Sequence, residues 1–116
     1  MPGNPLLATR PLADYVASIL GQAAIPTIVA ATTRSERWQD QGFEVRKVVT
    51  TYRFDNGAII RRTVEQDDFP DAQACAECWI GYEVLVPGSA GAGITPARKS
   101  FDNACREAFW LAYHCA

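Results

Sequence analysis

Hydrophobic residues recur at helical spacing near the N-terminus of the chain. In the segment RPLADYVASILGQ, one face of a helix collects Leu12, Val16, Ile19 and Leu20. Pro11 suits the first turn of such a helix, because its fixed φ and its missing N–H are tolerated there. Gly21 supplies a left-handed residue at which the helix can stop. The pattern therefore predicts an N-terminal helix with one apolar face.

The middle of the chain is rich in β-branched and aromatic residues, which favour strands. We predict a strand from about Thr27, a turn at QDQG (residues 39–42) and a second strand at residues 43–54. The Asn-Gly pair within residues 55–58 tolerates positive φ at both turn positions, so a tight hairpin should close there. Residues 27–66 are thus predicted to form an antiparallel meander.

The last part of the chain mixes helical, strand and loop signals. Residues 69–79 predict a short acidic helix, and residues 79–86 return to strand character. The Gly-rich residues 87–99 predict a mobile, exposed loop without the spacing of a phosphate-binding loop. Ser100 is a natural N-cap for a C-terminal helix over residues 100–116.

The predicted C-terminal helix has an apolar face that is rich in small residues. At about 100° per residue, this face collects Phe101, Ala104, Cys105, Ala108, Leu111, Ala112 and Cys115. Trp110 and Tyr113 fall on the opposite, polar side. Two large aromatic side chains are therefore expected on the face of the helix that the pattern predicts to be exposed to solvent.

Length and composition predict a single domain, residues 1–116. The 116 residues, 48% of them hydrophobic, are enough for an independent core. The expected fold is α+β, with an antiparallel sheet of about four strands and a helix packed on it from each end of the chain. The N-terminal stretch lacks the pattern of a secretory signal, so we expect a cytoplasmic protein whose four cysteines are thiols.

Cys75 and Cys78 form a C-x-x-C pair, which could serve zinc or redox chemistry. A four-ligand site would need partners, yet Cys105 and Cys115 are about 15 Å apart along a helix and cannot share one ion. Nearby acidic residues would raise the thiol pKa, which opposes a redox role. We interpret the pair as small buried residues, and a zinc- or thiol-dependent site remains the alternative.

The sequence contains no convincing catalytic set. His114 is the single histidine and lies close to the chain end, where a sheltered Ser–His or Cys–His pair is hard to build. The clustered carboxylates Asp67, Asp68 and Asp71 read as a solvated helix cap. We therefore predict a protein that is not an enzyme and uses no cofactor.

Charge is distributed unevenly along the middle of the chain. Residues 43–64 hold five basic side chains against two acidic ones, whereas residues 65–83 hold six acidic side chains and no basic one. The basic group could form a nucleic-acid surface with interleaved aromatics; it consists of Arg46, Lys47, Arg53, Arg61 and Arg62. Strand alternation places the last two on opposite faces, and the net charge is −2. Nucleic-acid binding is kept as an alternative function.

The function that we predict is binding to another protein, as a stoichiometric regulator or inhibitor that a phage or mobile element could encode. Trp, Tyr and Arg are enriched in interface hot spots, and separated charges steer a partner. The expected partner-binding residues are Trp110, Tyr113, Arg106, Asp67, Asp68, Asp71 and Glu77. The small-residue ridge of Ala104, Ala108 and Ala112 could also support a homodimer. No membrane partner is expected.

Overall fold

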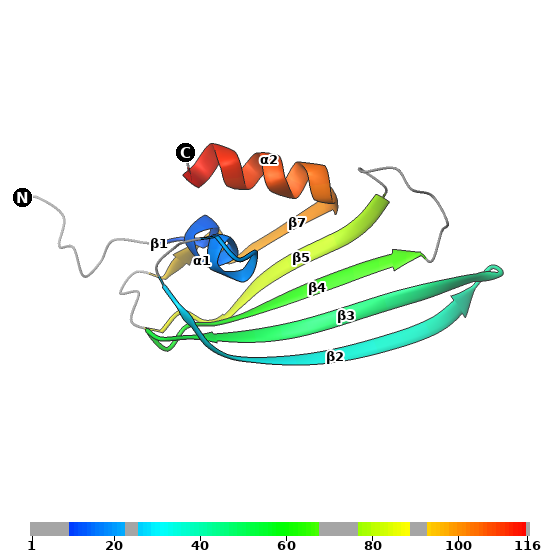
Figure 1. The fold of residues 1–116 in the computed structure, drawn as a ribbon, viewed down its shortest axis with the longest axis horizontal. Coiled ribbons are helices and arrows are strands. Elements are labelled where there is room, and N and C mark those ends of the chain that lie inside the picture. Colours follow the sequence, from blue (N-terminus) through cyan, green and yellow to red (C-terminus); the bar gives the residue numbers. More distant parts are fainter. Residues whose placement is uncertain (1–9, 23–25, 68–76, 89–92, 116) are drawn as a thin grey trace, which may run out of the picture.

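The computed structural model describes residues 10–22, 26–67, 77–88 and 93–115. A five-stranded antiparallel sheet has the order β2-β3-β4-β5-β7 and carries an N-terminal and a C-terminal helix on one face (Figure 1). Its strands are β2 (Ile28–Asp40), β3 (Phe43–Phe54), β4 (Ile59–Asp67), β5 (Glu77–Val86) and β7 (Arg98–Asn103). The helices are α1 (Leu12–Ile19) and α2 (Ala104–Cys115). Short strands β1 (Arg10–Pro11) and β6 (Ile94–Thr95) pair in parallel beside the sheet.

The predicted helix at the N-terminus and the predicted meander are both present. Gly21, with φ 81°, follows α1 as the left-handed stop. Strands β2, β3 and β4 pair in consecutive antiparallel ladders, as the β-branched pattern indicates.

The turn predicted at residues 39–42 is present, whereas the Asn-Gly turn differs from the prediction in its backbone angles. Gln41 and Gly42 both have positive φ, so this two-residue turn is of the type that matches strand twist. At the Asn-Gly turn only Gly57 has positive φ. Phe54 donates to the Ala58 carbonyl and accepts from the Gly57 N–H, both at 2.9 Å, which closes a three-residue loop. The expected turn with two positive φ angles is therefore wrong at Asn-Gly.

The main hydrophobic core lies between the helices and one face of the sheet. Leu12, Tyr15 and Val16 of α1 are fully buried against Phe54 and Ile60. The Tyr15 ring meets the Phe54 ring edge-on at 4.9 Å, and the Tyr15 hydroxyl accepts a hydrogen bond from Asn56 at 2.9 Å. The hairpin turn is thereby tied to the helix, because a buried tyrosine hydroxyl needs a polar partner.

The C-terminal helix begins later than predicted. Residues 98–103 form strand β7 rather than loop and helix, and α2 starts at Ala104. Asn103, not Ser100, caps it, because the Asn103 side-chain oxygen accepts a hydrogen bond from the Arg106 N–H at 2.8 Å. The sheet therefore has five strands instead of about four.

The buried face of α2 is also rotated from the predicted one. Glu107 and Leu111 are buried, 5% and 2% exposed, and Trp110 is half-buried against the core. The small-residue side of the helix, which we expected on the core or on a dimer axis, is exposed to solvent; it consists of Ala104, Cys105, Ala108 and Ala112. This ridge does not pack on the sheet.

The sheet has one face covered by helices and one face left open by the described residues. The helix face presents Ile60, Arg62, Ile80, Tyr82 and Phe101. By strand alternation, the open face presents residues such as Arg34, Lys47, Arg61, Glu83 and Arg98. The β2–β3 hairpin extends past both helices (Figure 1).

Two further predicted segments are only partly described. The predicted acidic helix at 69–79 lies outside the described residues up to position 76, and Glu77, Cys78 and Trp79 belong to strand β5. The predicted loop at 87–99 is interrupted by β6 and by the start of β7, and residues 89–92 lie outside the described part. Neither described helix is long and apolar enough to cross a membrane.

Candidate functional site

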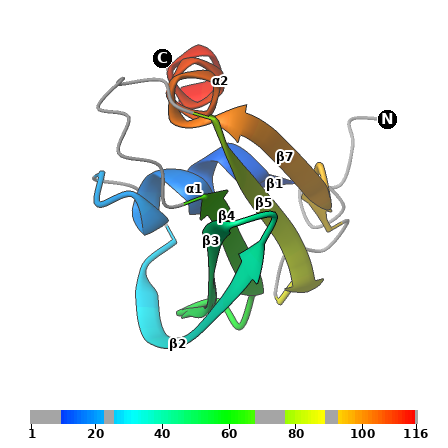
Figure 2. The same ribbon diagram turned by 90° about the vertical axis from the view of Figure 1, so that its right-hand side faces the viewer.

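Strand β7 forms one edge of the sheet, directly beneath α2 (Figure 2). The Val84 N–H donates to the Ala97 carbonyl at 2.8 Å, so residues 97, 99 and 101 direct their main-chain groups toward β5. The main-chain groups of Arg98, Ser100 and Asp102 point away from the sheet. No described strand pairs with them, which leaves a short open edge for hydrogen bonding.

A groove runs along this edge between β7 and α2. We call it the β7 groove, and six of its lining residues are Trp79, Lys99, Asp102, Arg106, Phe109 and Trp110. The Trp79 side chain is 56% exposed and Phe109 is 76% exposed. The Trp110 ring stacks at a tilt on Phe101, with the ring centroids 5.4 Å apart. Large aromatic rings therefore gather at one open strand edge, where they are available to a binding partner.

The charged side chains of the groove are mostly cationic. The Lys99 ammonium lies 5.4 Å from the centre of the Phe101 ring, and Arg106 forms an ion pair with Asp102 at 3.1 Å. The Arg106 side chain is still largely exposed, so this pair leaves most of the guanidinium accessible. The groove offers cations beside aromatic faces, which suits an acidic or aromatic segment of a partner.

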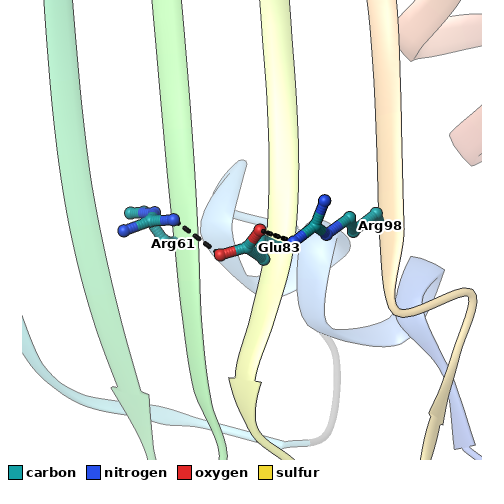
Figure 3. A network of polar contacts seen from close by, with 3 residues as sticks. All are labelled: Arg61, Glu83 and Arg98. Atoms are coloured by element: carbon teal, nitrogen blue, oxygen red, sulfur yellow. Dashed lines mark hydrogen bonds and ion pairs between the residues drawn. The ribbon is translucent and has the colours of Figure 1, made fainter.

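A polar network continues from the edge onto the open face of the sheet. Glu83 accepts from Arg61 at 2.5 Å through one carboxylate oxygen and pairs with Arg98 at 2.9 Å through the other (Figure 3). The neighbouring Gly81 has no side chain, and the surface is hollowed there. The Arg98 side chain is 80% exposed, so its pair with Glu83 contributes little to stability and leaves it free to meet a ligand.

A second polar cluster is buried between the sheet and α2. Arg62 donates to the Tyr82 hydroxyl at 2.9 Å, and the Tyr82 hydroxyl donates to a Glu107 carboxylate oxygen at 2.5 Å. Arg62 also lies 3.5 Å from the same oxygen. A buried carboxylate is normally costly, and here one cation and one hydroxyl compensate it. The cluster fixes how α2 sits on the sheet.

The surroundings of this cluster make it unsuited to proton transfer near neutral pH. Burial raises the pKa of Tyr82 well above its ordinary range, and the hydrogen bond to Glu107 raises it further against the opposing charge of Arg62. Burial lowers the pKa of Arg62, but the contacts with Tyr82 and Glu107 outweigh it and the net pKa is raised. Both groups therefore keep their protons, and the cluster is a structural anchor for the β7 groove.

The structure separates the residues that the sequence grouped as a protein-binding surface. Trp110 and Arg106 line the β7 groove, whereas Tyr113 is 74% exposed on α2 outside it. Asp68 and Asp71 lie outside the described residues. Asp67 ends β4 and Glu77 begins β5, and their side chains are not described. The structure therefore brings Trp110 and Arg106 together and leaves Tyr113 apart, and the predicted interface remains a prediction.

The five basic residues considered for nucleic acid are divided between the two faces of the sheet. Register places Lys47, Arg53 and Arg61 on the open face and Arg46 and Arg62 on the helix face. Arg62 is held by Tyr82 and Glu107, and Arg61 is paired with Glu83. They therefore do not form one continuous basic surface.

The cysteines differ from the expectation of four thiols. Cys105 is disulfide-bonded, and its partner lies outside the residues whose side chains are described. Cys78 is a free, half-buried thiol, and burial together with the charge of Glu107 raises its pKa. Disulfides persist mainly in oxidising compartments. The disulfide at Cys105 therefore does not support the expectation that the protein resides in the reducing cytoplasm.

The alternative metal site is not assembled by the described side chains. Within residues 10–22, 26–67, 77–88 and 93–115, no three His, Cys, Asp or Glu side chains are placed to hold one ion. Cys75 lies outside these residues, and the raised pKa of the Cys78 thiol disfavours the thiolate that a metal or a redox reaction needs.

Sequence reasoning missed Trp79, Phe109 and the anchor residue Glu107. Glu107 was expected on the polar, exposed face of the helix, but contacts with Tyr82 and Arg62 of the sheet bury it. Phe109 was assigned to neither face. The start of the helix was misplaced because Ser100 was taken as its cap. The polar and apolar alternation in RKSFDN, residues 98–103, was the available signal for a strand. With Asn103 as the cap, the first turn of the helix would have started at Ala104.

No protein-family model, no curated protein and no solved structure matches the chain.

Proposed function

We propose that this protein is a non-catalytic binding protein, a stoichiometric regulator or inhibitor that engages another protein through the β7 groove. The observation that carries the proposal is the coincidence of an open strand edge with exposed aromatic rings. Trp79 and Phe109 are exposed beside the outward main-chain groups of Ser100. Exposed aromatic clusters mark interaction sites more often than scattered apolar residues do.

The geometry suggests that the partner binds as an extended segment. A strand added to β7 would hydrogen-bond with the outward main-chain groups of Arg98, Ser100 and Asp102. Its alternate side chains would enter the groove between β7 and α2, where Phe109 and Trp110 lie. Strand addition beside a helix gives affinity through the main chain and specificity through the groove.

The charges along the β7 edge determine which extended segments would bind best. Arg98, Lys99 and Arg106 lie along this edge, and Asp102 is the acidic side chain that lines the groove among them. An acidic residue next to an aromatic or aliphatic one would meet a cation and an aromatic face together. The preferred ligand is therefore an extended segment that carries both an acidic and a large apolar side chain.

The test selects peptides from a random library on the immobilised full chain and measures their affinity for variants by calorimetry. Phe109→Ala should weaken the selected peptides by about tenfold or more, as at an interface hot spot. Tyr113→Ala is the matched control, since its ring is as exposed on the same helix but lies outside the groove. It should leave the affinity unchanged.

Two results would count against the proposal. One is a selection that yields no binding peptide. The other is a peptide whose affinity survives Phe109→Ala and is lost in Tyr113→Ala. Salt-sensitive binding of single-stranded DNA that survives Phe109→Ala would instead support the nucleic-acid alternative.

A further inference from the structure

The opposite edge of the sheet is an unusually long strand. Strand β2 has 13 residues, and its described side chains from Val29 to Gln39 are all exposed. A typical strand has about five or six residues. From Ala30 to Asp40 its register with β3 has no shift, and the segment contains no proline. Natural proteins usually interrupt or cover such an edge, because it pairs readily with another strand.

The turn at the end of β2 determines which main-chain groups are unpaired. Gln41 and Gly42 form a two-residue turn, so the flanking Asp40 and Phe43 are a hydrogen-bonded pair. Alternate residues of β2 then direct their N–H and C=O groups away from β3; they are Ala31, Thr33, Ser35, Arg37 and Gln39. The hydroxyls of Thr33 and Thr50 approach to 3.2 Å, as expected where opposite side chains are closest and the main chains are not bonded.

We propose that a second copy of this chain pairs with β2 in antiparallel orientation, with the two-fold axis at Ser35. The two Ser35 residues would exchange main-chain hydrogen bonds across the axis. Arg34 of each copy would then lie opposite Glu36 of the other. These residues occupy the positions where opposite side chains come closest, with Cα atoms about 4.5 Å apart.

The charges of β2 favour this register over its neighbours. An axis at Arg37 would place two arginines directly opposite each other, which is destabilising. An axis at Thr33 would place Arg34 opposite Thr32 and give no ion pair. Arg34 and Glu36 already form an exposed ion pair at 3.6 Å within each chain. The axis at Ser35 adds two such pairs between the chains, and it sets Trp38 against Thr32 on the same face. Among two-fold axes at residues 31–39, only the axis at Ser35 sets an arginine opposite a glutamate, and it sets no like charges opposite each other.

The dimer would extend the sheet without using the β7 groove. A two-fold axis perpendicular to the sheet joins the two five-stranded sheets at their β2 edges and leaves both β7 edges at the outer ends. The interface is self-complementary, as such an axis requires. The inference is independent of the proposed function, because it involves the other edge of the sheet.

The first test compares two proline variants of the full chain by sedimentation equilibrium over a range of concentrations. Ser35 and Ser100 both direct their N–H away from the sheet, on β2 and β7 respectively. Proline removes that donor and blocks strand addition. The wild type should dimerise, Ser35→Pro should be monomeric, and Ser100→Pro should dimerise as the wild type does.

The second test exchanges the charges of the proposed pairs. Arg34→Glu and Glu36→Arg should each raise the dissociation constant of the dimer about tenfold, because two attractive pairs become two repulsive ones. The double variant carrying both changes should restore the wild-type constant. Circular dichroism of each variant would verify that the monomer remains folded.

A wild type that stays monomeric at every concentration would overturn the inference. A dimer that survives Ser35→Pro would also overturn it, and would direct attention to the exposed ridge of Ala104, Ala108 and Ala112 on α2. Restoration of the dimer by the double charge exchange would support the register at Ser35 directly.

Discussion

The end of the sheet beneath the helices and the end formed by the β2–β3 hairpin are built on different principles. Beneath the helices, Tyr15, Phe54 and Ile60 are fully buried, and α2 is fixed by the buried Glu107. In the hairpin, Arg37 pairs with Glu44 at 3.4 Å with most of its side chain exposed. One end excludes water from its polar contacts, and the other leaves them in water.

The two ends therefore differ in what holds them together. Buried apolar area and a compensated charge cluster hold the helix-covered end. In the hairpin, Val45 and Val49 are buried, 5% and 7% exposed, but they lie outside the core cluster under the helices. The outer strand β2 remains exposed along its edge. The β7 groove lies at the junction, since its aromatic residues sit on a helix that the buried cluster anchors.

Removal of Glu107 should have the largest effect on stability. In Glu107→Ala, Arg62 would remain buried without its carboxylate, which costs about 3–5 kcal/mol. Arg37→Ala removes an exposed ion pair of the hairpin and should cost less than about 1 kcal/mol. Urea denaturation of both variants measures the contrast.

A double variant controls for the charge itself. Replacing Arg62 and Glu107 together by Met and Leu removes both charges, so its loss of stability should be smaller than that of Glu107→Ala. Equal losses for Glu107→Ala and Arg37→Ala would contradict the distinction between the two ends.

Loss of the disulfide should have the next largest effect. Cys105 lies in the first turn of α2, so Cys105→Ser should lower the free energy of unfolding by about 2–4 kcal/mol. Reductant should lower the stability of the wild type to the same extent and leave Cys105→Ser unchanged. Peptide mapping of the unreduced protein would identify the second cysteine. A wild type insensitive to reductant would refute this role.

The smallest of the three effects concerns alkaline pH. The pKa of Tyr82 is raised by burial and by Glu107, so the folded state holds this proton more tightly than the unfolded state does. Its contribution is fully present below about pH 10, the ordinary tyrosine pKa, and declines above it. The free energy of unfolding should fall by up to about 1.4 kcal/mol per pH unit there. Tyr82→Phe should flatten this decline, and an unchanged slope in that variant would contradict the assignment.

Local patterns predicted the elements that depend on local chemistry. The helix ending at Gly21 and the meander through β2, β3 and β4 follow from periodicity, β-propensity and turn residues. The position of β7 did not follow. Ser100 and Asn103 can both cap a helix, so the sequence left the start of α2 undecided. Because Phe101 pairs with Ile80 of β5, the residues up to Asn103 form a strand and the helix begins after them.

The candidate site shows the same division. Trp110 and Arg106 were recognisable by residue type, since aromatics and arginine favour interfaces. Their neighbours Trp79 and Lys99 join them only because β5 and β7 pair beside α2.

By itself the sequence determined a chain with an N-terminal helix, a central meander and a C-terminal helix, because periodicity and turn chemistry act over a few residues. The tertiary structure alone decided which face of α2 is buried. A glutamate becomes a core residue when a strand supplies Arg62 and Tyr82 to compensate its charge, and no local pattern encodes that partnership.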